Sequence, residues 1–226
     1  MQTDLGALVF DMDGLMIDTE PIYKVAWQAA SAELGYPIDD AFYATFVGRP
    51  TPACEEDLLA AFGAAFPLER FRVRWPSLWR AEAVASGIQR KPGVLECLDF
   101  AKARGLPVAV ATSSDADYAA FSLRHAGLDG RFDIVVTGEQ VARGKPAPDI
   151  YLEASRRLQM DPAACVALED SEAGVLAASR AGMRTLLIPD GAPPTETAVR
   201  AAFRVLDSLH EARDLISRLL PGRLGE

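Results

Sequence analysis

The sequence predicts an α/β fold: a parallel sheet with helices on both faces, plus an all-helical domain inserted after the first strand. Two observations predict the sheet: a run of apolar residues covers 5–10, and from residue 92 onward further short apolar runs alternate with helical patterns. The insertion is predicted by the region between about 19 and 90, which holds all three tryptophans but no strand-like apolar run.

The apolar runs are continuous rather than alternating, which is typical of strands buried on both faces of a parallel sheet. We expect strands over residues 5–10, 106–112, 133–136, 165–168 and 185–188, and helices between them over 94–104, 115–126, 148–158 and 171–181. Gly105, Gly127 and Gly182 follow three of these helices, at the point where a left-handed residue commonly ends a helix. The tail is expected to add a short strand near 203–206 and a closing helix over 208–219.

Helical periodicity in the insertion predicts helices over 20–34, 39–46, 51–64 and 68–86. Lys91-Pro92-Gly93 marks the return of the chain to the sheet. We therefore expect a core domain formed by 1–17 and 90–226, and a helical domain over 18–89.

Composition and charge exclude several classes of function. Half of the 226 residues are hydrophobic and 24% are charged, as in ordinary globular proteins. The net charge of −9 would repel a nucleic-acid backbone, so we expect no nucleic-acid partner. No apolar run approaches the ~20 residues of a membrane span, and the first residues lack the features of a secretory signal. We expect a cytoplasmic protein without a membrane partner, whose three cysteines, which form no CxxC pair, stay reduced.

Polar residues follow four of the predicted strands. The four segments are Asp11-Met12-Asp13-Gly14, Thr112-Ser113-Ser114, Gly144-Lys145-Pro146-Ala147-Pro148-Asp149 and Glu169-Asp170-Ser171. Each has an ordinary explanation when taken alone: a turn for the first, a helix cap for the second and fourth, and a solvated loop lysine for the third. The carboxyl ends of parallel strands share one edge of the sheet, however, and open sheets bind ligands there. We therefore expect the four segments to meet.

Together the four segments predict phosphoryl transfer. Asp11, Asp13, Glu169 and Asp170 would form a negative cluster, and oxygen ligands in that number call for Mg²⁺, which binds phosphate oxygens as well. Lys145 would act as a fixed positive charge on a phosphate. Catalysis of phosphoryl transfer depends mainly on such positioning and charge stabilisation.

These residues in this order resemble the haloacid dehalogenase superfamily. The motifs DMDG, TSS, GKPAPD and LEDSEAGV carry the resemblance, which covers the chain nearly end to end. It implies a Rossmann-like core, and it implies that the helical insertion is a cap that closes over the site. Within the superfamily, the DMDGLMIDTE opening and the IPDG segment look more like sugar-phosphate and pseudouridine-5′-phosphate phosphatases than like β-phosphoglucomutase.

The resemblance also implies a role for each motif residue. Asp11 would be the nucleophile and Asp13 the general acid and base. Thr112 and the amide of Ser113 would hold the phosphoryl group, and Lys145 would bridge Asp11 and phosphate. The Mg²⁺ ligands would be Asp11, the carbonyl of Asp13 and Asp170, with Glu169 beside them or among them. In the helical insertion, Gly48-Arg49 lies between two helices, where Arg49 is either a surface residue or part of a substrate-contacting loop.

The function expected is a magnesium-dependent phosphohydrolase that acts on a small phosphate ester through an aspartyl-phosphate, as a monomer or small homo-oligomer. One alternative is a phosphomutase resembling β-phosphoglucomutase, but that family has a histidine in the stretch that here ends in Tyr23. A non-catalytic, phospho-accepting regulatory protein is a second alternative; receiver domains are shorter and carry the acceptor on an internal strand. Dehalogenation is disfavoured by Asp13, because a halide leaving group needs no proton donor.

Overall fold

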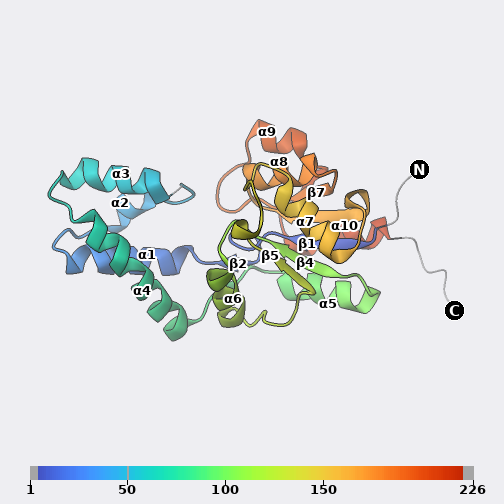
Figure 1. Cartoon of the computed structure of the whole chain (residues 1–226), viewed down its shortest axis with the longest axis horizontal. Coiled ribbons are helices and arrows are strands. Elements are labelled where there is room, and N and C mark those ends of the chain that lie inside the picture. The colour runs from blue at the N-terminus through green and yellow to red at the C-terminus, as the bar shows by residue number, and fades with distance from the viewer. Residues whose placement is uncertain (1–4, 50, 221–226) are drawn as a thin grey trace. The chain divides into compact units, whose positions relative to one another are not determined.

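The computed structural model describes residues 5–49 and 51–220, which form two compact units (Figure 1). One unit comprises Met1–Asp18 together with Gln89–Glu226, and the other comprises Thr19–Ile88. Each boundary lies one residue from the expected one. Each unit has a hydrophobic core of its own.

The first unit is built on a six-stranded sheet in the order β5-β4-β1-β6-β7-β8, and all neighbouring strands in it are parallel. The strands are β1 Ala7–Phe10, β4 Val108–Ala111, β5 Ile134–Val136, β6 Cys165–Glu169, β7 Arg184–Leu187 and β8 Arg204–Val205. In the register, Leu8 of β1 lies between Val108 and Val166. Every residue of β1, β4 and β6 is buried, because helices cover both faces of the sheet.

The helices described in this unit alternate with the strands. They are α5 Val94–Arg104, α6 Ala116–His125, α7 Asp149–Leu158, α8 Glu172–Arg180, α9 Glu196–Ala201 and α10 Leu209–Leu219. Figure 1 shows α5 and α6 on one side of the sheet, and α7 and α8 on the other. Gly105, Gly127 and Gly182 have φ values of 64°, 67° and 86°, the left-handed conformation expected after α5, α6 and α8. The predicted α/β class is confirmed.

The second unit contains α1 Glu20–Glu33, α2 Asp40–Ala44, α3 Thr51–Phe62 and α4 Leu68–Ser86. Its core is aromatic: Trp27 packs edge-on against Phe71 with ring centroids 5.1 Å apart, and Phe66 lies 5.5 Å from Phe71. Each large aromatic side chain buries a large apolar surface, and a unit this small needs that burial to be stable.

Several short elements have no counterpart among the predicted ones, among them two strands and a helix. β2 (Ile17–Asp18) pairs antiparallel with β3 (Gln89–Arg90), so that a ribbon forms where the chain leaves the first unit and returns to it. Strands of two residues are too short for alternation of apolar and polar side chains to reveal them. Helix α9 is also short, and Thr195 caps it by accepting a hydrogen bond from the N–H of Ala198.

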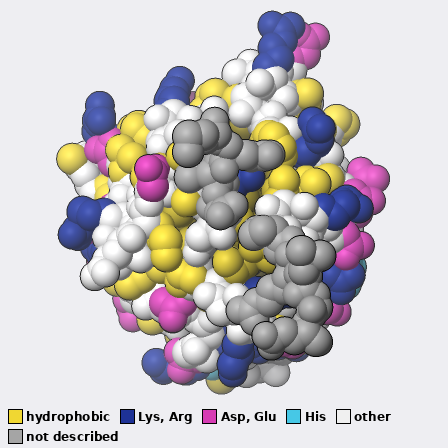
Figure 2. All heavy atoms as spheres, turned by 90° about the vertical axis from the view of Figure 1, so that its right-hand side faces the viewer, with side chains coloured by type: hydrophobic (Ala, Val, Ile, Leu, Met, Phe, Trp, Pro, Cys, Tyr) yellow, Lys and Arg dark blue, Asp and Glu magenta, His cyan; other side chains and the backbone are white. Residues whose placement is uncertain are grey.

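In the part of the chain that the structure describes, every helix is too short or too polar to cross a bilayer. Figure 2 shows the face of the first unit that lies at the right in Figure 1. On that face, the described Lys and Arg side chains are interspersed with Asp, Glu and hydrophobic ones.

Candidate active site

The carboxyl edge of the sheet brings the predicted segments together. Asp11 follows β1, Thr112 follows β4, and Glu169 is the last residue of β6. These three residues lie side by side because β4 and β6 are the two neighbours of β1. Lys145 reaches the same edge from the loop between β5 and α7.

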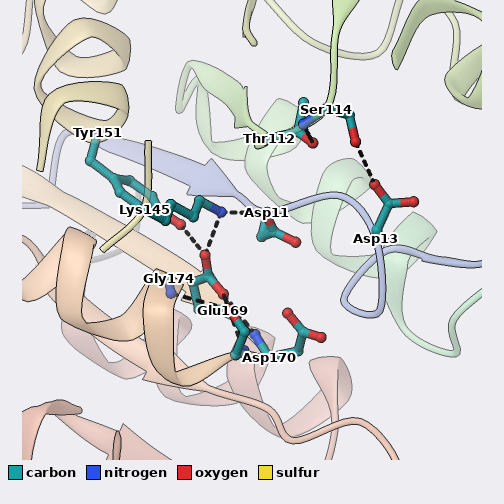
Figure 3. A network of polar contacts seen from close by, with 10 residues as sticks. Asp11, Asp13, Thr112, Ser114, Lys145, Tyr151, Glu169, Asp170 and Gly174 are labelled. Atoms are coloured by element: carbon teal, nitrogen blue, oxygen red, sulfur yellow. Dashed lines mark hydrogen bonds and ion pairs between the residues drawn. The ribbon is translucent and has the colours of Figure 1, made fainter. Parts of the chain in front are cut away.

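Lys145 lies at the centre of this group (Figure 3). Its ammonium donates to Oδ1 of Asp11 and, at 2.6 Å, to Oε1 of Glu169. Tyr151 of α7 donates its hydroxyl to the same oxygen of Glu169, also at 2.6 Å. The side chains of Lys145 and Glu169 are only 5% and 0% exposed. Lys145 is therefore a buried, fixed charge and not a solvated loop residue.

The second oxygen of Glu169 is held by the start of α8. It accepts hydrogen bonds from the N–H groups of Asp170 and Ser171, at 3.1 and 3.2 Å, and from the Ser171 hydroxyl at 3.1 Å. The hydroxyl oxygen of Ser171 accepts from the N–H of Gly174, so Ser171, and not Asp170, caps the helix. A Cβ at Gly174 would overlap the Glu169 carboxylate, which explains the glycine. The Asp170 carboxylate is thus left for another role.

The acidic cluster consists of Asp11, Glu169 and Asp170, which each place one carboxylate oxygen within 4.8 Å of the others. Burial, followed by the charge of Glu169, raises the pKa of Asp170 to about 7. Burial also raises the pKa of Asp11, although the charge of Lys145 opposes the rise. Burial would lower the pKa of Lys145, but the charges of Asp11 and Glu169 outweigh it and raise that pKa.

Three carboxylates around one ammonium leave negative charge uncompensated, and a divalent cation would neutralise it. The donors are hard oxygens, as Mg²⁺ prefers. The residues present therefore fit the expected cofactor.

The carboxylate of Asp13 lies outside this cluster and faces the segment that follows β4 (Figure 3). The Ser114 hydroxyl lies 3.1 Å from its Oδ2, and the Tyr118 hydroxyl lies 2.9 Å from its Oδ1. The chain turns at Gly14, whose φ is 82° and where a Cβ would overlap Asp170. The Asp13 carboxylate thus lies beside Ser114 and Tyr118, and the acidic cluster is formed by Asp11, Glu169 and Asp170.

Thr112 and Ser113, the expected phosphoryl-binding residues, lie at the same edge. Thr112 is 2% exposed, and its hydroxyl oxygen accepts from the N–H of Ser114 at 3.1 Å. Ser113 is exposed, and its backbone carbonyl lies so close to Gly138 that a Cβ there would overlap it. The segment 112–114 is therefore held by the Thr112–Ser114 hydrogen bond and by its close packing on Gly138, while Ser113 stays accessible to solvent.

Three residues of the network carried no role in the sequence analysis. Ser114 lies in an expected segment but looks like a helix cap, and Tyr118 and Tyr151 lie on amphipathic helices. The positions of their hydroxyls depend on how α6 and α7 dock on the sheet. No spacing in the sequence could have assigned them.

The expected substrate-contacting residues of the insertion, Gly48 and Arg49, line a pocket of about 130 Å³ within the helical unit. Most of its other walls are aromatic: Tyr23, Trp27, Tyr43 and Phe46. Arg49 forms an ion pair with Asp57 and donates to the carbonyl of Thr45 at 3.2 Å. Its guanidinium is thus partly neutralised by its own unit.

A comparison with protein-family models matches residues 5–182 to the haloacid dehalogenase-like hydrolases. The chain belongs to this family. This confirms the predicted family and, with it, the predicted enzyme class, a phosphoric monoester hydrolase.

This hydrolase has curated relatives that match it over most of their length. It is 35% identical over 182 residues to the "Phosphorylated carbohydrates phosphatase" of Thermotoga maritima, covering 80% of this chain and 84% of the relative. It is 33% identical over 180 residues to the "Fructose-1-phosphate phosphatase YqaB" of Escherichia coli, covering 79% and 93%. Among solved structures, it matches a Thermotoga maritima protein provisionally described as a β-phosphoglucomutase, with a TM-score of 0.85 and 31% identity over 96% of this chain and 100% of that one.

Proposed function

We propose that this hydrolase is a magnesium-dependent phosphatase that cleaves a small phosphorylated metabolite through an aspartyl-phosphate on Asp11. The observation that carries the proposal is the position of Asp11. Lys145 donates to one oxygen of Asp11. A carboxylate oxygen of Asp11 also lies within 4.8 Å of carboxylate oxygens of Glu169 and Asp170. A nucleophile at the carboxyl edge of a parallel sheet is accessible to a ligand that binds there.

The proposed reaction consists of two displacements at phosphorus. In the first, an oxygen of Asp11 forms a bond to phosphorus while the ester P–O bond breaks, and Asp13 gives its proton to the leaving oxygen. In the second, water attacks the same phosphorus, the bond to Asp11 breaks, and Asp13 takes the proton of the water. Dividing the reaction in this way replaces one very slow hydrolysis by two easier steps.

The neighbours of the two aspartates support these different roles. The ammonium of Lys145 favours an ionised Asp11, which is the nucleophilic form. Asp13 has hydroxyl partners in Ser114 and Tyr118. A hydroxyl donates to a carboxylate and accepts from a carboxylic acid, so it fits both protonation states that an acid–base residue must visit.

Asp11, Asp170 and the backbone carbonyl of Asp13 would hold Mg²⁺. When bound, Mg²⁺ supplies positive charge that offsets the charge of the phosphoryl group. Glu169 already uses both oxygens, one for Lys145 and Tyr151 and the other for the start of α8. We therefore propose that Glu169 mainly orients Lys145 and supports the cation from beside its direct ligands. Thr112 and the amide of Ser113 would hold the phosphoryl oxygens.

For the substrate we propose a sugar phosphate or nucleoside monophosphate. Two relatives are named as phosphatases of phosphorylated carbohydrates and of fructose 1-phosphate. Gly48 and Arg49, in the aromatic-walled pocket, would contact the organic part of the ester. Tyr23, which packs against Trp75 and Trp79, stands in the stretch where β-phosphoglucomutases have a histidine. We therefore favour hydrolysis over mutase activity.

Hydrolysis of an aryl phosphate by the purified protein, with Mg²⁺ and with a chelator, tests the reaction. We expect activity with Mg²⁺, none with the chelator and recovery when Mg²⁺ is added back. A panel of phosphorylated metabolites then identifies the substrate by release of inorganic phosphate. Full activity in the chelator would contradict the metal site, and isomerisation of a hexose 1-phosphate without phosphate release would favour the mutase.

A further inference from the structure

Asp13 is held at both carboxylate oxygens by hydroxyls from one short segment. Ser114 Oγ lies 3.1 Å from Oδ2 (Figure 3). Tyr118 Oη lies 2.9 Å from Oδ1. Asp13 follows β1, whereas Ser114 and Tyr118 follow β4. One contact would leave the carboxylate free to turn about its terminal torsion, which has no sharp preference of its own. Two contacts, one to each oxygen, fix its plane.

The start of α6 explains why Tyr118 reaches this position. Asp115 caps the helix by accepting a hydrogen bond from the N–H of Tyr118 at 2.7 Å, which places Tyr118 in the first turn. Long side chains on a helix lean toward its N-terminus, and the N-terminus of α6 lies at the carboxyl edge of the sheet. The backbone of Tyr118 is therefore fixed in the first turn of α6, and its side chain extends toward the edge of the sheet where Asp13 lies.

The backbone of Ser114 is fixed as well. Its N–H donates to the hydroxyl oxygen of Thr112 at 3.1 Å, and its carbonyl accepts from the N–H of Gly138 at 3.0 Å. Both hydroxyls thus belong to a rigid segment, and a rigid support is what positions a side chain for chemistry.

We propose that Tyr118, together with Ser114, is a positioning residue that holds the Asp13 carboxylate in the orientation from which it exchanges protons. This role rests on the proposed function of Asp13 as general acid and base. Both hydroxyls contact the Asp13 carboxylate, so each would act through Asp13. Losing one of them should impair only those steps in which a proton moves.

Two substrates with different leaving groups test the proposal through kcat/KM, which reports the first displacement. An alkyl phosphate needs its leaving oxygen protonated, whereas an aryl phosphate with an acidic phenol hardly does. We expect Tyr118→Phe to lose about 10-fold or more in kcat/KM on the alkyl ester and less than about 3-fold on the aryl ester. Ser114→Ala should show the same pattern.

Tyr36→Phe is the matched control. It removes a tyrosine hydroxyl that donates to the Ala65 carbonyl at 3.0 Å within the helical unit. We expect equal kcat/KM values for this variant and the unmodified protein on both esters. Thermal unfolding of each variant verifies that the fold is retained, and Ser114→Ala keeps the proposal testable if Tyr118→Phe does not fold.

A double-mutant cycle separates positioning from a general effect on structure. In a single turnover, Tyr118→Phe should slow hydrolysis of the aspartyl-phosphate in the unmodified background. In the Asp13→Asn background it should cause no further loss, because the group it positions is gone. Equal losses on the two esters, or additive losses in the cycle, would overturn the positioning role and leave the phosphatase proposal intact. Absence of any magnesium-dependent hydrolysis by the unmodified protein would overturn both.

Discussion

Asp11 and Asp13 are two residues apart in the sequence, yet their surroundings in the fold are opposite in kind. Asp11 is 7% exposed and lies against the ammonium of Lys145 and the acidic cluster. Asp13 is half-buried and lies against two neutral hydroxyls. Lys145 favours the ionised form of Asp11 that the proposed attack needs, whereas the hydroxyls beside Asp13 can donate or accept as its proposed protonation changes. The comparison shows that distant segments, not the motif itself, distinguish the two carboxylates.

The largest effect on the Asp11 side should come from Lys145→Met. We expect kcat to fall by about 10²–10³-fold, because the charge that favours ionised Asp11 and would attract phosphate is removed. The unfolding free energy should fall by about 3 kcal/mol without Mg²⁺, since two buried carboxylates lose their partner. Added Mg²⁺ should restore part of this loss. Kinetics and denaturant unfolding measure the two effects.

Arg143→Met serves as the control for that variant. Arg143 lies in the same loop, but its side chain is 71% exposed and pairs with Asp149 at 2.8 Å. A change in kcat within about 2-fold is expected, because exposed ion pairs contribute little. If the two variants lost activity equally, kcat would depend on the structure of the loop rather than on the buried charge of Lys145.

An intermediate effect should appear in Asp170→Asn, and it should depend on pH. In the metal-free protein the pKa of Asp170 is raised from 3.8 to about 7, so the folded state holds a proton that the unfolded state releases near pH 4. The stabilisation from that proton is complete below about pH 4 and is lost as the pH rises through about 7. Asp170→Asn should therefore leave stability unchanged at pH 4 and raise it by about 1–2 kcal/mol above pH 7 without Mg²⁺.

With Mg²⁺ present, Asp170→Asn should instead be less stable than the unmodified protein, because the substitution removes a charged ligand. Magnesium affinity of the unmodified protein should also fall as the pH drops below about 7, where Asp170 must release its proton to bind the cation. Calorimetry at several pH values measures both, and Asp129→Asn, a substitution at an exposed loop residue, is the control. Unchanged affinity in Asp170→Asn would exclude Asp170 as a ligand.

The smallest effect on the Asp11 side should come from Tyr151→Phe. It removes a hydroxyl that donates to Glu169 at 2.6 Å, but Lys145 still binds the same oxygen. We expect a loss of about 1–2 kcal/mol in unfolding free energy and only a few-fold loss in kcat. A loss as large as that of Lys145→Met would contradict this ranking and show that the Tyr151 hydroxyl is as important to the site as the Lys145 ammonium.

The sheet and the edge at which the site lies could be predicted because both follow from patterns along the chain. Continuous apolar runs identify doubly buried strands, and parallel strands place Asp11, Thr112 and Glu169 at one edge. The contacts of Asp13 could not be predicted in this way. They depend on the docking of α6, which decides whether Tyr118 reaches Asp13 or points into solvent. The strands of the β2–β3 ribbon could not be predicted for another reason: with two residues each, they are too short to show an alternation of apolar and polar side chains.

Helix capping is a second place where the sequence left alternatives that the structure decides. Asp170 and Ser171 are both good capping residues, and their order along the chain does not discriminate between them. The Ser171 hydroxyl caps α8, and the Asp170 carboxylate joins the acidic cluster. That distinction rests on a few torsion angles between β6 and α8, which no pattern of residue types encodes.

Trapping of the phosphorylated enzyme tests the division between Asp11 and Asp13 most directly. The unmodified protein, Asp11→Asn and Asp13→Asn would each be mixed with Mg²⁺ and an aryl phosphate with a good leaving group, quenched rapidly and analysed by intact-mass measurement. We predict a transient phosphoryl adduct in the unmodified protein and none in Asp11→Asn. Asp13→Asn should accumulate an adduct on Asp11, because the first displacement still proceeds while its hydrolysis lacks a base. A phosphoryl adduct on Asp11→Asn, or equal losses on good and poor leaving groups in Asp13→Asn, would contradict the account.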